Sequence, residues 1–252
     1  MYRCEAATAA GFVQQLATGY LMHGYHHYVV GELPRDKDPR AIDARMVERY
    51  KLDTSRATRA RRKIAGLANA QYIRYRSFFV ICATDPVGGH EFFKAHAPCQ
   101  VRHIKKSPIA FGGYSIGYHR GVDRKWHISV RIHPERYRDV KAYLVDLASK
   151  RSRDNMVAEL RRLQFEPYAP VRRQLLSILR AVNRERIVKG FEQVTFEDLN
   201  AAWRVGNGKR ERWLTRRIVR PFGGVSERLQ GHEVVATNLG DPGVLRVVAE
   251  CK

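Results

Sequence analysis

The stretch TRARRKIAGLANAQYIRYRSFFVICAT, residues 58–84, joins a cationic segment to a run in which aromatic and basic side chains alternate. With Arg56 just before it, the cationic segment holds five cations within eight positions. Ile64 and Leu67 fall on one face of a helix that would leave the cations outside, whereas residues 71–83 show the period of two expected of a strand. The stretch therefore predicts a basic surface helix that leads into a strand of a sheet.

The overall charge predicts the kind of partner. The 252 residues include 46 Lys and Arg against 25 Asp and Glu, a formal net charge of +21. Because such an excess repels itself unless a polyanion balances it, we expect the partner to be nucleic acid, RNA or DNA, with room for a protein partner in a nucleoprotein complex. No run of 18 apolar residues and no signal-peptide pattern occurs, so we expect no membrane partner and a cytoplasmic location.

The order of the expected elements predicts an α+β fold. Strands are expected at 19–34, 71–83, 109–119 and 125–132, and helices at 41–50, 54–67 and from Pro134 onward. This order suits an antiparallel sheet with helices on one face, close to the ferredoxin-like plan, which would leave the other face uncovered. From Ser152 the composition becomes helical, so we expect an α+β domain at 1–151 and a basic helical region at 152–252.

The period-two pattern assigns residues to the uncovered sheet face. In the strand 71–83 the expected inward residues are Ile73, Tyr75, Phe79, Ile81 and Ala83, and the outward residues are Tyr72, Arg74, Arg76 and Phe78. In the strand 125–132 the expected inward residues are Trp126, Ile128, Val130 and Ile132, and the outward residues are Lys125, His127, Ser129 and Arg131. Aromatic rings and guanidinium groups on one face suit single-stranded nucleic acid, although an ordinary solvated face of an arginine-rich protein would look the same.

Two short fragments are similar to the RNA-recognition motif. YVVGELP, residues 28–34, resembles the first-strand signature of that family, and RYRSFFVIC, residues 74–82, is similar to its basic and aromatic octamer. Ser77 stands where the octamer has an aromatic residue, and the octamer's glycines are absent. The resemblance therefore implies similar surface chemistry and not membership of the family.

Histidine and tyrosine residues suggest an alternative function, a nuclease or strand transferase. Rolling-circle initiators and single-strand transposases share this sheet plan, and they use two histidines around one hydrophobic residue together with a nucleophilic tyrosine. No His-x-His occurs here, but His119 and His127 could oppose one another across a hairpin, with Tyr143 on the following helix. The sequence leaves open whether the protein is an enzyme.

No cofactor is expected beyond one candidate zinc site. The segment HEFFKAHAPCQVRH offers His90, His96, Cys99 and His103, but its spacing matches no common zinc pattern, and solvated loop histidines are the simpler interpretation. His26, His27 and His119 are read as polar positions on half-buried strands. The scattered carboxylates do not indicate a two-metal nuclease, and the glycine-rich segment after residue 110 lacks the lysine of a phosphate loop.

The C-terminal third carries a second nucleic-acid signal. Thr195 and Asp198 have the spacing of a capping box, a short helix runs to Trp203, and after GNG a second helix begins with Lys209, Arg210, Arg212, Arg216 and Arg217. Two helices joined by a glycine turn indicate a helix-turn-helix, for which the hairpin expected at 232–250 could serve as a wing. A non-specific helical bundle would fit nearly as well.

Together these observations predict a nucleic-acid-binding protein of a mobile element or of an RNA-processing system. The expected nucleic-acid contacts are the cations of the basic helix, the outward residues of the strands and the basic residues of the C-terminal third: Arg56, Arg59, Arg62, Lys63, Tyr72, Arg74, Arg76, Phe78, Lys125, Arg131, Lys209, Arg210, Arg212, Arg216 and Arg217.

Overall fold

The computed structural model describes residues 2–85, 89–121, 123–163 and 165–198, together with the backbone of Ala236–Thr237 and Arg246–Val248. The chain divides into two compact units, the first made of 1–112, 117–128 and 216–252, and the second of 113–116 and 129–215. The predicted boundary at 151 falls within the second unit. Helices and antiparallel sheets occur together, which confirms the α+β class.

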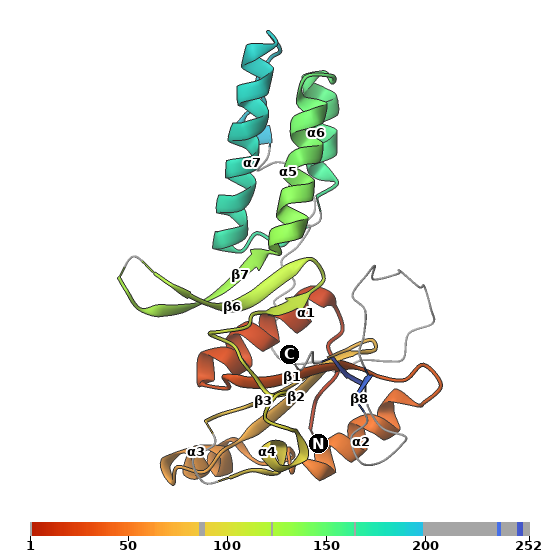
Figure 1. The fold of residues 1–252 in the computed structure, drawn as a ribbon, viewed down its shortest axis with the longest axis vertical. Helices are drawn as coiled ribbons and strands as arrows, with labels where there is room; N and C mark the ends of the chain where they lie inside the picture. Colours follow the sequence, from red (N-terminus) through yellow and green to blue (C-terminus); the bar gives the residue numbers. More distant parts are fainter. Residues whose placement is uncertain are drawn as a thin grey trace. The chain divides into compact units, whose positions relative to one another are not determined.

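An antiparallel sheet forms the centre of the first unit (Figure 1). Its strands are β1 (His27–Glu32), β2 (Ala70–Tyr75), β3 (Phe78–Ala83), β4 (Arg102–His103), β8 (Ala236–Thr237) and β9 (Arg246–Val248). The order is β2-β3-β1-β9-β8, and β4 also pairs with β1. Every one of these pairings is antiparallel.

Helices lie on both sides of this sheet, as Figure 1 shows. On one side are α2 (Pro39–Arg49), α3 (Arg56–Ile64) and α4 (Glu91–Ala95). On the other side is α1 (Ala9–Gln14), which continues as a π-helical segment η1 (Gln15–Tyr20) and a 3₁₀ turn η2 (Leu21–His23). The predicted strand 19–34 is therefore wrong in its first half, and only 27–32 are extended.

The predicted single strand 71–83 is two strands joined by a turn at Arg76 and Ser77. Arg76 adopts the left-handed conformation (φ 55°) that such a turn requires. Because Tyr75 pairs with Phe78 across the turn, the faces of even and odd positions exchange between β2 and β3. Tyr72 consequently lies on the same face as Phe79, not opposite to it, so the predicted inward and outward sets are wrong.

Both faces of the central strands are buried. Tyr72, Phe79 and Ile81 belong to the apolar cluster that packs against α2 and α4. Facing the other way, Phe78 packs against Phe12 of α1, with ring centroids 5.8 Å apart. The face of β2 and β3 that was expected to be uncovered is therefore covered, by the helix that begins at residue 9.

A three-stranded sheet has the order β5-β6-β7, made of β5 (Ile109–Phe111), β6 (Tyr114–Arg120) and β7 (Trp126–Ile132). The predicted hairpin across 120–124 is confirmed, with the Gly121 amide donating to the Lys125 carbonyl at 2.8 Å. Trp126, expected to point inward, is exposed, and Ser129, expected to point outward, is buried.

The second unit contains the helices α5 (Pro134–Ala148), α6 (Arg153–Arg161) and α7 (Ala169–Val188). The apolar stripe of α7 is buried as its spacing predicts, at Val171, Leu175, Ile178, Leu179 and Val182. Arg186 continues this stripe and is buried too, donating to the carbonyls of Ala148 and Arg151 at 3.1 and 2.8 Å. A cation thus satisfies carbonyl groups at the end of α5.

Within the described part of the chain, no helix combines the length and the apolar character needed to cross a membrane. The capping box is confirmed, since the Asp198 amide donates to Thr195 Oγ1 at 3.2 Å and the Thr195 amide donates to Asp198 Oδ2 at 2.9 Å. The rest of the predicted helix-turn-helix, with Lys209, Arg210, Arg212, Arg216 and Arg217, lies outside the residues described above. Of the hairpin predicted at 232–250 as a wing, the described residues form β8 and β9, which pair antiparallel, and β9 also pairs with β1 in the central sheet.

Candidate nucleic-acid interface and histidine cluster

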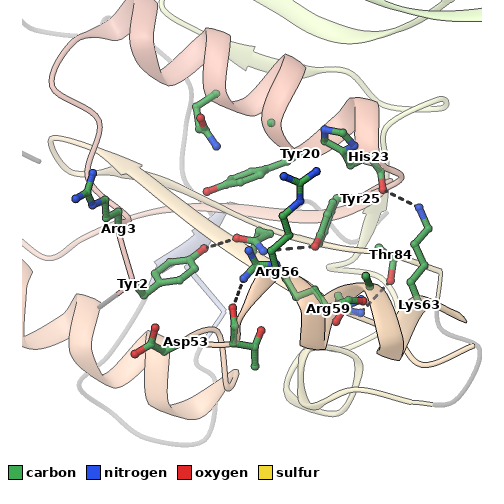
Figure 2. Close-up of a pocket in the computed structure, with 16 residues that line it drawn as sticks. Tyr2, Arg3, Tyr20, His23, Tyr25, Asp53, Arg56, Arg59, Lys63 and Thr84 are labelled. Atoms are coloured by element: carbon green, nitrogen blue, oxygen red, sulfur yellow. Dashed lines mark hydrogen bonds between the residues drawn. The ribbon is translucent and has the colours of Figure 1, made fainter. Parts of the chain in front are cut away.

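A cationic pocket of about 690 Å³ lies in the first unit, between α3, the η1–η2 segment and the N-terminal residues (Figure 2). Its described lining includes four permanent cations, Arg3, Arg56, Arg59 and Lys63, against one carboxylate, Asp53. Figure 2 shows the α3 side chains on one wall and Tyr20 and His23 on the opposite wall. The pocket therefore offers an anion a concave and strongly positive surface.

Helix periodicity explains why α3 supplies three of these cations. Ser55 caps the helix, with its Oγ accepting from the Thr58 amide at 3.0 Å. Arg56, Arg59 and Lys63 follow at spacings of three and four residues, which place them on one helix face. Arg61 does not line the pocket.

Backbone carbonyls on the pocket wall hold two of these cations. Arg59 donates to the Thr54 carbonyl, and Lys63 Nζ donates to the His23 carbonyl at 3.4 Å. Carbonyl oxygens carry no formal charge, so these two contacts do not neutralise the side chains.

Neutral hydroxyl groups form the inner surface of the pocket. Tyr2 Oη accepts from the Tyr72 amide at 2.7 Å and donates to Gln71 Oε1 at 2.8 Å. Gln71 Nε2 in turn donates to Tyr25 Oη at 3.4 Å. Burial raises the pKa of Tyr2, Tyr20 and Tyr25 above the ordinary tyrosine value. These tyrosines therefore stay protonated at neutral pH and serve as hydrogen-bonding groups.

A second candidate site is a histidine cluster, two of whose residues are sequence neighbours of residues that line the pocket. His26, Asp85 and His103 each place one possible ligand atom within 4.8 Å of the other two. His26 precedes β1, Asp85 follows β3, and His103 lies on β4, which pairs with β1. His27 Nε2 lies 3.3 Å from Asp85 Oδ1, and the His27 and His103 ring centroids are 5.0 Å apart. The pairing of three strands thus gathers residues that are distant in the sequence.

Hydrogen bonds and burial determine the state of His26. Tyr118 Oη donates its proton to the Leu21 carbonyl at 2.6 Å and lies 3.1 Å from His26 Nε2. Since Tyr118 has no second proton, His26 must donate from Nε2, which leaves its Nδ1 as a lone pair. Burial first, and then the Lys105 ammonium, lowers the pKa of His26, and burial also lowers that of His103. The lowered pKa favours the neutral form of both rings, which is the form that binds metals.

Several of the aromatic and basic residues predicted to lie on an uncovered sheet face are buried. Tyr72 is fully buried with its hydroxyl on Asp43 (2.7 Å), and Arg74 is 3% exposed and paired with the same carboxylate (2.8 Å). Tyr28, from the fragment that resembles the RNA-recognition motif, is also buried. Phe78 packs against Phe12 and Phe111. The alternation therefore reflects a sheet buried on both faces and not a stacking surface.

Four further predicted contacts are not among the residues that line the pocket. Arg76 is exposed at the β2–β3 turn, with its guanidinium 5.4 Å from the Tyr75 ring centroid. Arg62 lines a second pocket of about 340 Å³. Lys125 is exposed, and Arg131 is half-buried with Nε donating to Ser129 Oγ at 3.0 Å.

The predicted catalytic residues are exposed and engaged locally. His119 Nδ1 lies 2.9 Å from its neighbour's carbonyl at Arg120, and His127 Nε2 lies 2.9 Å from Asp123. The bond from His127 lowers the pKa of Asp123. In the second unit the Tyr143 hydroxyl donates to Glu159 at 3.2 Å, and this bond raises the pKa of Tyr143.

The predicted zinc ligands do not form one group among the described residues. His90 caps α4 by accepting from the Phe92 amide at 3.1 Å, and His96 is buried against Tyr50. Of that set, His103 alone belongs to the cluster with His26 and Asp85.

Sequence reasoning missed Arg3 and His23 in the pocket and Asp85 in the cluster. The accumulation of nine of the ten histidines between His23 and His133 was the available signal. The chain matches no protein-family model, no curated protein and no solved structure.

Proposed function

We propose that the protein binds nucleic acid and that backbone phosphates occupy the cationic pocket of the first unit. The observation that carries this proposal is the convergence of four cations around about 690 Å³ with a single carboxylate among the described lining residues. Arginine pairs with phosphate oxygens through two parallel hydrogen bonds, and Lys63 adds a mobile point charge. The net charge of +21 supports the same partner.

A single-stranded or structured nucleic acid fits this pocket better than a regular duplex. Proteins usually read a duplex with an element that protrudes into a groove, whereas unpaired nucleotides are held in concave sites. The volume lies within the roughly 300–1,000 Å³ typical of ligand pockets. Tyrosine hydroxyls and the Gln71 amide could contact sugar or base edges there, in RNA or in DNA.

The broader setting is part of the same proposal. The element order β1, α2–α3, β2, β3 and the sheet order β2-β3-β1-β9 support a ferredoxin-like plan with an additional helix on its second face. We retain a helix-turn-helix after Thr195 as a second contact, a cytoplasmic location, and a role in a mobile element or in RNA processing.

Paired charge-removing variants test the pocket. In R56A/K63A two pocket cations are lost, and we expect affinity for fluorescent single-stranded and hairpin RNA and DNA to fall roughly ten- to a hundredfold. The control R45A/R61A removes two exposed cations from α2 and α3 that do not line the pocket. Equal losses in both variants would refute a role for the pocket and leave only a diffuse charge effect.

A nuclease or strand transferase that uses His119, His127 and Tyr143 is the second candidate. The supporting observation is the contact between His127 and Asp123, because a carboxylate orients an imidazole for general base catalysis. Incubation of labelled strands, duplexes and hairpins with wild type and H127A tests it. Cleavage by wild type and not by H127A is expected from this function, and equal cleavage by both would eliminate it.

A further inference from the structure

We propose that His26, His103 and Asp85 bind one divalent metal ion of the zinc class, with open coordination positions for water or for a phosphate oxygen. The phosphate part rests on the proposed nucleic-acid binding, whereas the metal part stands on the cluster alone. The position of the cluster supports the link. Tyr25 and Thr84 line the cationic pocket, and each directly precedes a proposed ligand in the chain.

The three side chains are close to the geometry that a metal requires. Their ligand atoms lie within 4.8 Å of one another. In a tetrahedral site with metal–ligand bonds of about 2.0–2.2 Å, the ligand atoms lie roughly 3.4 Å apart. The remaining adjustment is at most about 1.4 Å, and a small shift of the Asp85 side chain, which is 67% exposed, provides it.

Neighbouring residues already orient two of the ligands. Tyr118 Oη accepts a hydrogen bond from the Nε2–H of His26, which leaves Nδ1 of His26 as the atom that can coordinate the metal. The His27 ring lies against Asp85, with Nε2 3.3 Å from Oδ1. Second contacts of this kind, from a hydroxyl to a ligating histidine and from a histidine to a ligating carboxylate, fix the rotamers of metal ligands.

Two local features oppose metal binding and must be overcome. Coordination through His103 Nε2 would place the ring proton on Nδ1, so the contact from the Lys105 amide to Nδ1 at 3.3 Å would be lost. The Lys105 ammonium, 5.9 Å from the Tyr118 ring centroid, adds positive charge near the ion. The same charge would favour a phosphate that joins the metal.

The two histidines and one aspartate determine which metal ions fit the site, and they leave the bound ion accessible to solvent. Two imidazoles and one carboxylate suit Zn²⁺, Co²⁺, Fe²⁺ or Ni²⁺, whereas Mg²⁺ and Ca²⁺ prefer oxygen ligands. Three protein ligands leave at least one position open, as in catalytic and not in structural zinc sites. His26 and His103 are half-buried and Asp85 is exposed, so solvent and a phosphate group can reach the ion.

Titration with Co²⁺ tests the metal site directly. We expect visible absorption bands that saturate at one equivalent, disappear on addition of Zn²⁺ and persist in excess Mg²⁺. D85N and H103A should each weaken Co²⁺ binding at least tenfold, a loss typical of metal-site changes. The matched control is D123N, which also replaces an exposed carboxylate paired with a histidine but belongs to no three-ligand group among the described residues. Melting temperatures of all variants establish that they are folded.

The outcomes separate the metal site from the nucleic-acid proposal. Equal Co²⁺ affinity of wild type, D85N and D123N would overturn the site. R56A/K63A should bind Co²⁺ like wild type, so its failure to bind nucleic acid would not affect the metal result. With nucleic acid as probe, Zn²⁺ should strengthen binding by wild type several-fold relative to EDTA and leave D85N unchanged. A wild-type affinity that is the same in Zn²⁺ and EDTA would refute the open position for phosphate.

Discussion

Arg74 shows how a single buried cation organises the first unit. Its Nε and Nη2 donate to the two oxygens of Asp43 at 3.0 and 2.8 Å, and Nη1 pairs with Glu5 at 3.2 Å. Tyr72 donates to the same Asp43 carboxylate at 2.7 Å. Asp43 on α2, the N-terminal segment and β2 therefore share one hydrogen-bonded network. Each member depends on the others, because a buried charge without its partner is strongly unfavourable.

Truncation of Arg74 should consequently destabilise the fold. In R74A the Asp43 carboxylate stays buried without its cation, and we expect the free energy of unfolding to fall by roughly 3–5 kcal/mol in urea denaturation. R76A, two residues away at an exposed turn, should change it by less than about 0.5 kcal/mol. A stable R74A with reduced affinity for nucleic acid would instead make Arg74 a binding residue, as the strand pattern first predicts.

His96 should make stability depend on pH. Its ring is 3% exposed, Nε2 lies 3.0 Å from Tyr50 Oη, and burial lowers its pKa to about 4. Because the unfolded chain binds the proton more tightly, with a pKa of about 6.5, this contribution to stability is complete above pH 6.5 and is lost as the pH falls toward 4. The expected loss between neutral pH and about pH 5 is roughly 2 kcal/mol.

The variant H96Q isolates this effect from other titrating groups. Glutamine cannot be protonated, so its unfolding free energy should fall less steeply than that of wild type over the same pH range. Urea denaturation of both proteins at several pH values measures the difference. Parallel pH profiles would show that His96 is protonated without cost in the folded state.

At the scale of elements, α1 covers the face of β2 and β3 that the sequence pattern predicts to be free. Phe12 and Leu16 are fully buried, and the Phe12 ring lies 4.4 Å from that of Phe111 and 5.8 Å from that of Phe78. We expect F12A to lower the free energy of unfolding by roughly 3–5 kcal/mol, as a core truncation does. T18A, at an exposed position of the same helical segment, should have little effect. A harmless F12A would mean that α1 does not cover the sheet in solution.

The strand 71–83 shows where sequence patterns are sufficient and where they fail. The spacing of buried residues in α7 was predictable because a single helix carries the whole pattern. In β2 and β3 the alternation continues through the turn, and Arg76, which takes the left-handed conformation there, is not a typical turn residue. A two-residue turn moves the even positions to the other face of the sheet, and nothing in the alternating sequence marks this exchange. The inward residues could therefore not be derived from the alternation of residue types alone.

The two candidate sites were also predictable from the sequence only in part. The cations of α3 were predictable as a group, since their charge and spacing are local. The pocket also needs residues 2–25, whose helix was not expected, and the histidine cluster needs Asp85 and His103 brought together by strand pairing. Contacts between residues that are far apart in the sequence depend on the fold topology, which local sequence patterns do not encode.

At the scale of the whole molecule, the charge of +21 is distributed and not confined to the pocket. Lys125 and Arg76 are exposed away from it, and five predicted contacts lie between Lys209 and Arg217, outside the described residues. Binding of a polyanion would relieve the repulsion among all these groups. The pocket should therefore account for a defined part of the electrostatic affinity and not for all of it.

The salt dependence of nucleic-acid binding measures the pocket's share of the electrostatic affinity. For single strands the slope of log K against log salt concentration is about −0.7 for each phosphate neutralised. We expect a steep slope for wild type in fluorescence anisotropy from about 50 to about 200 mM NaCl, and a slope less negative by about 1.4 in R56A/K63A, because two contacts are lost. R45A/R61A carries the same net charge as R56A/K63A, so it should keep the wild-type slope if contacts rather than total charge determine it. A flat wild-type response would contradict phosphate binding altogether, and equal slopes in the two double variants would move the contacts away from the pocket.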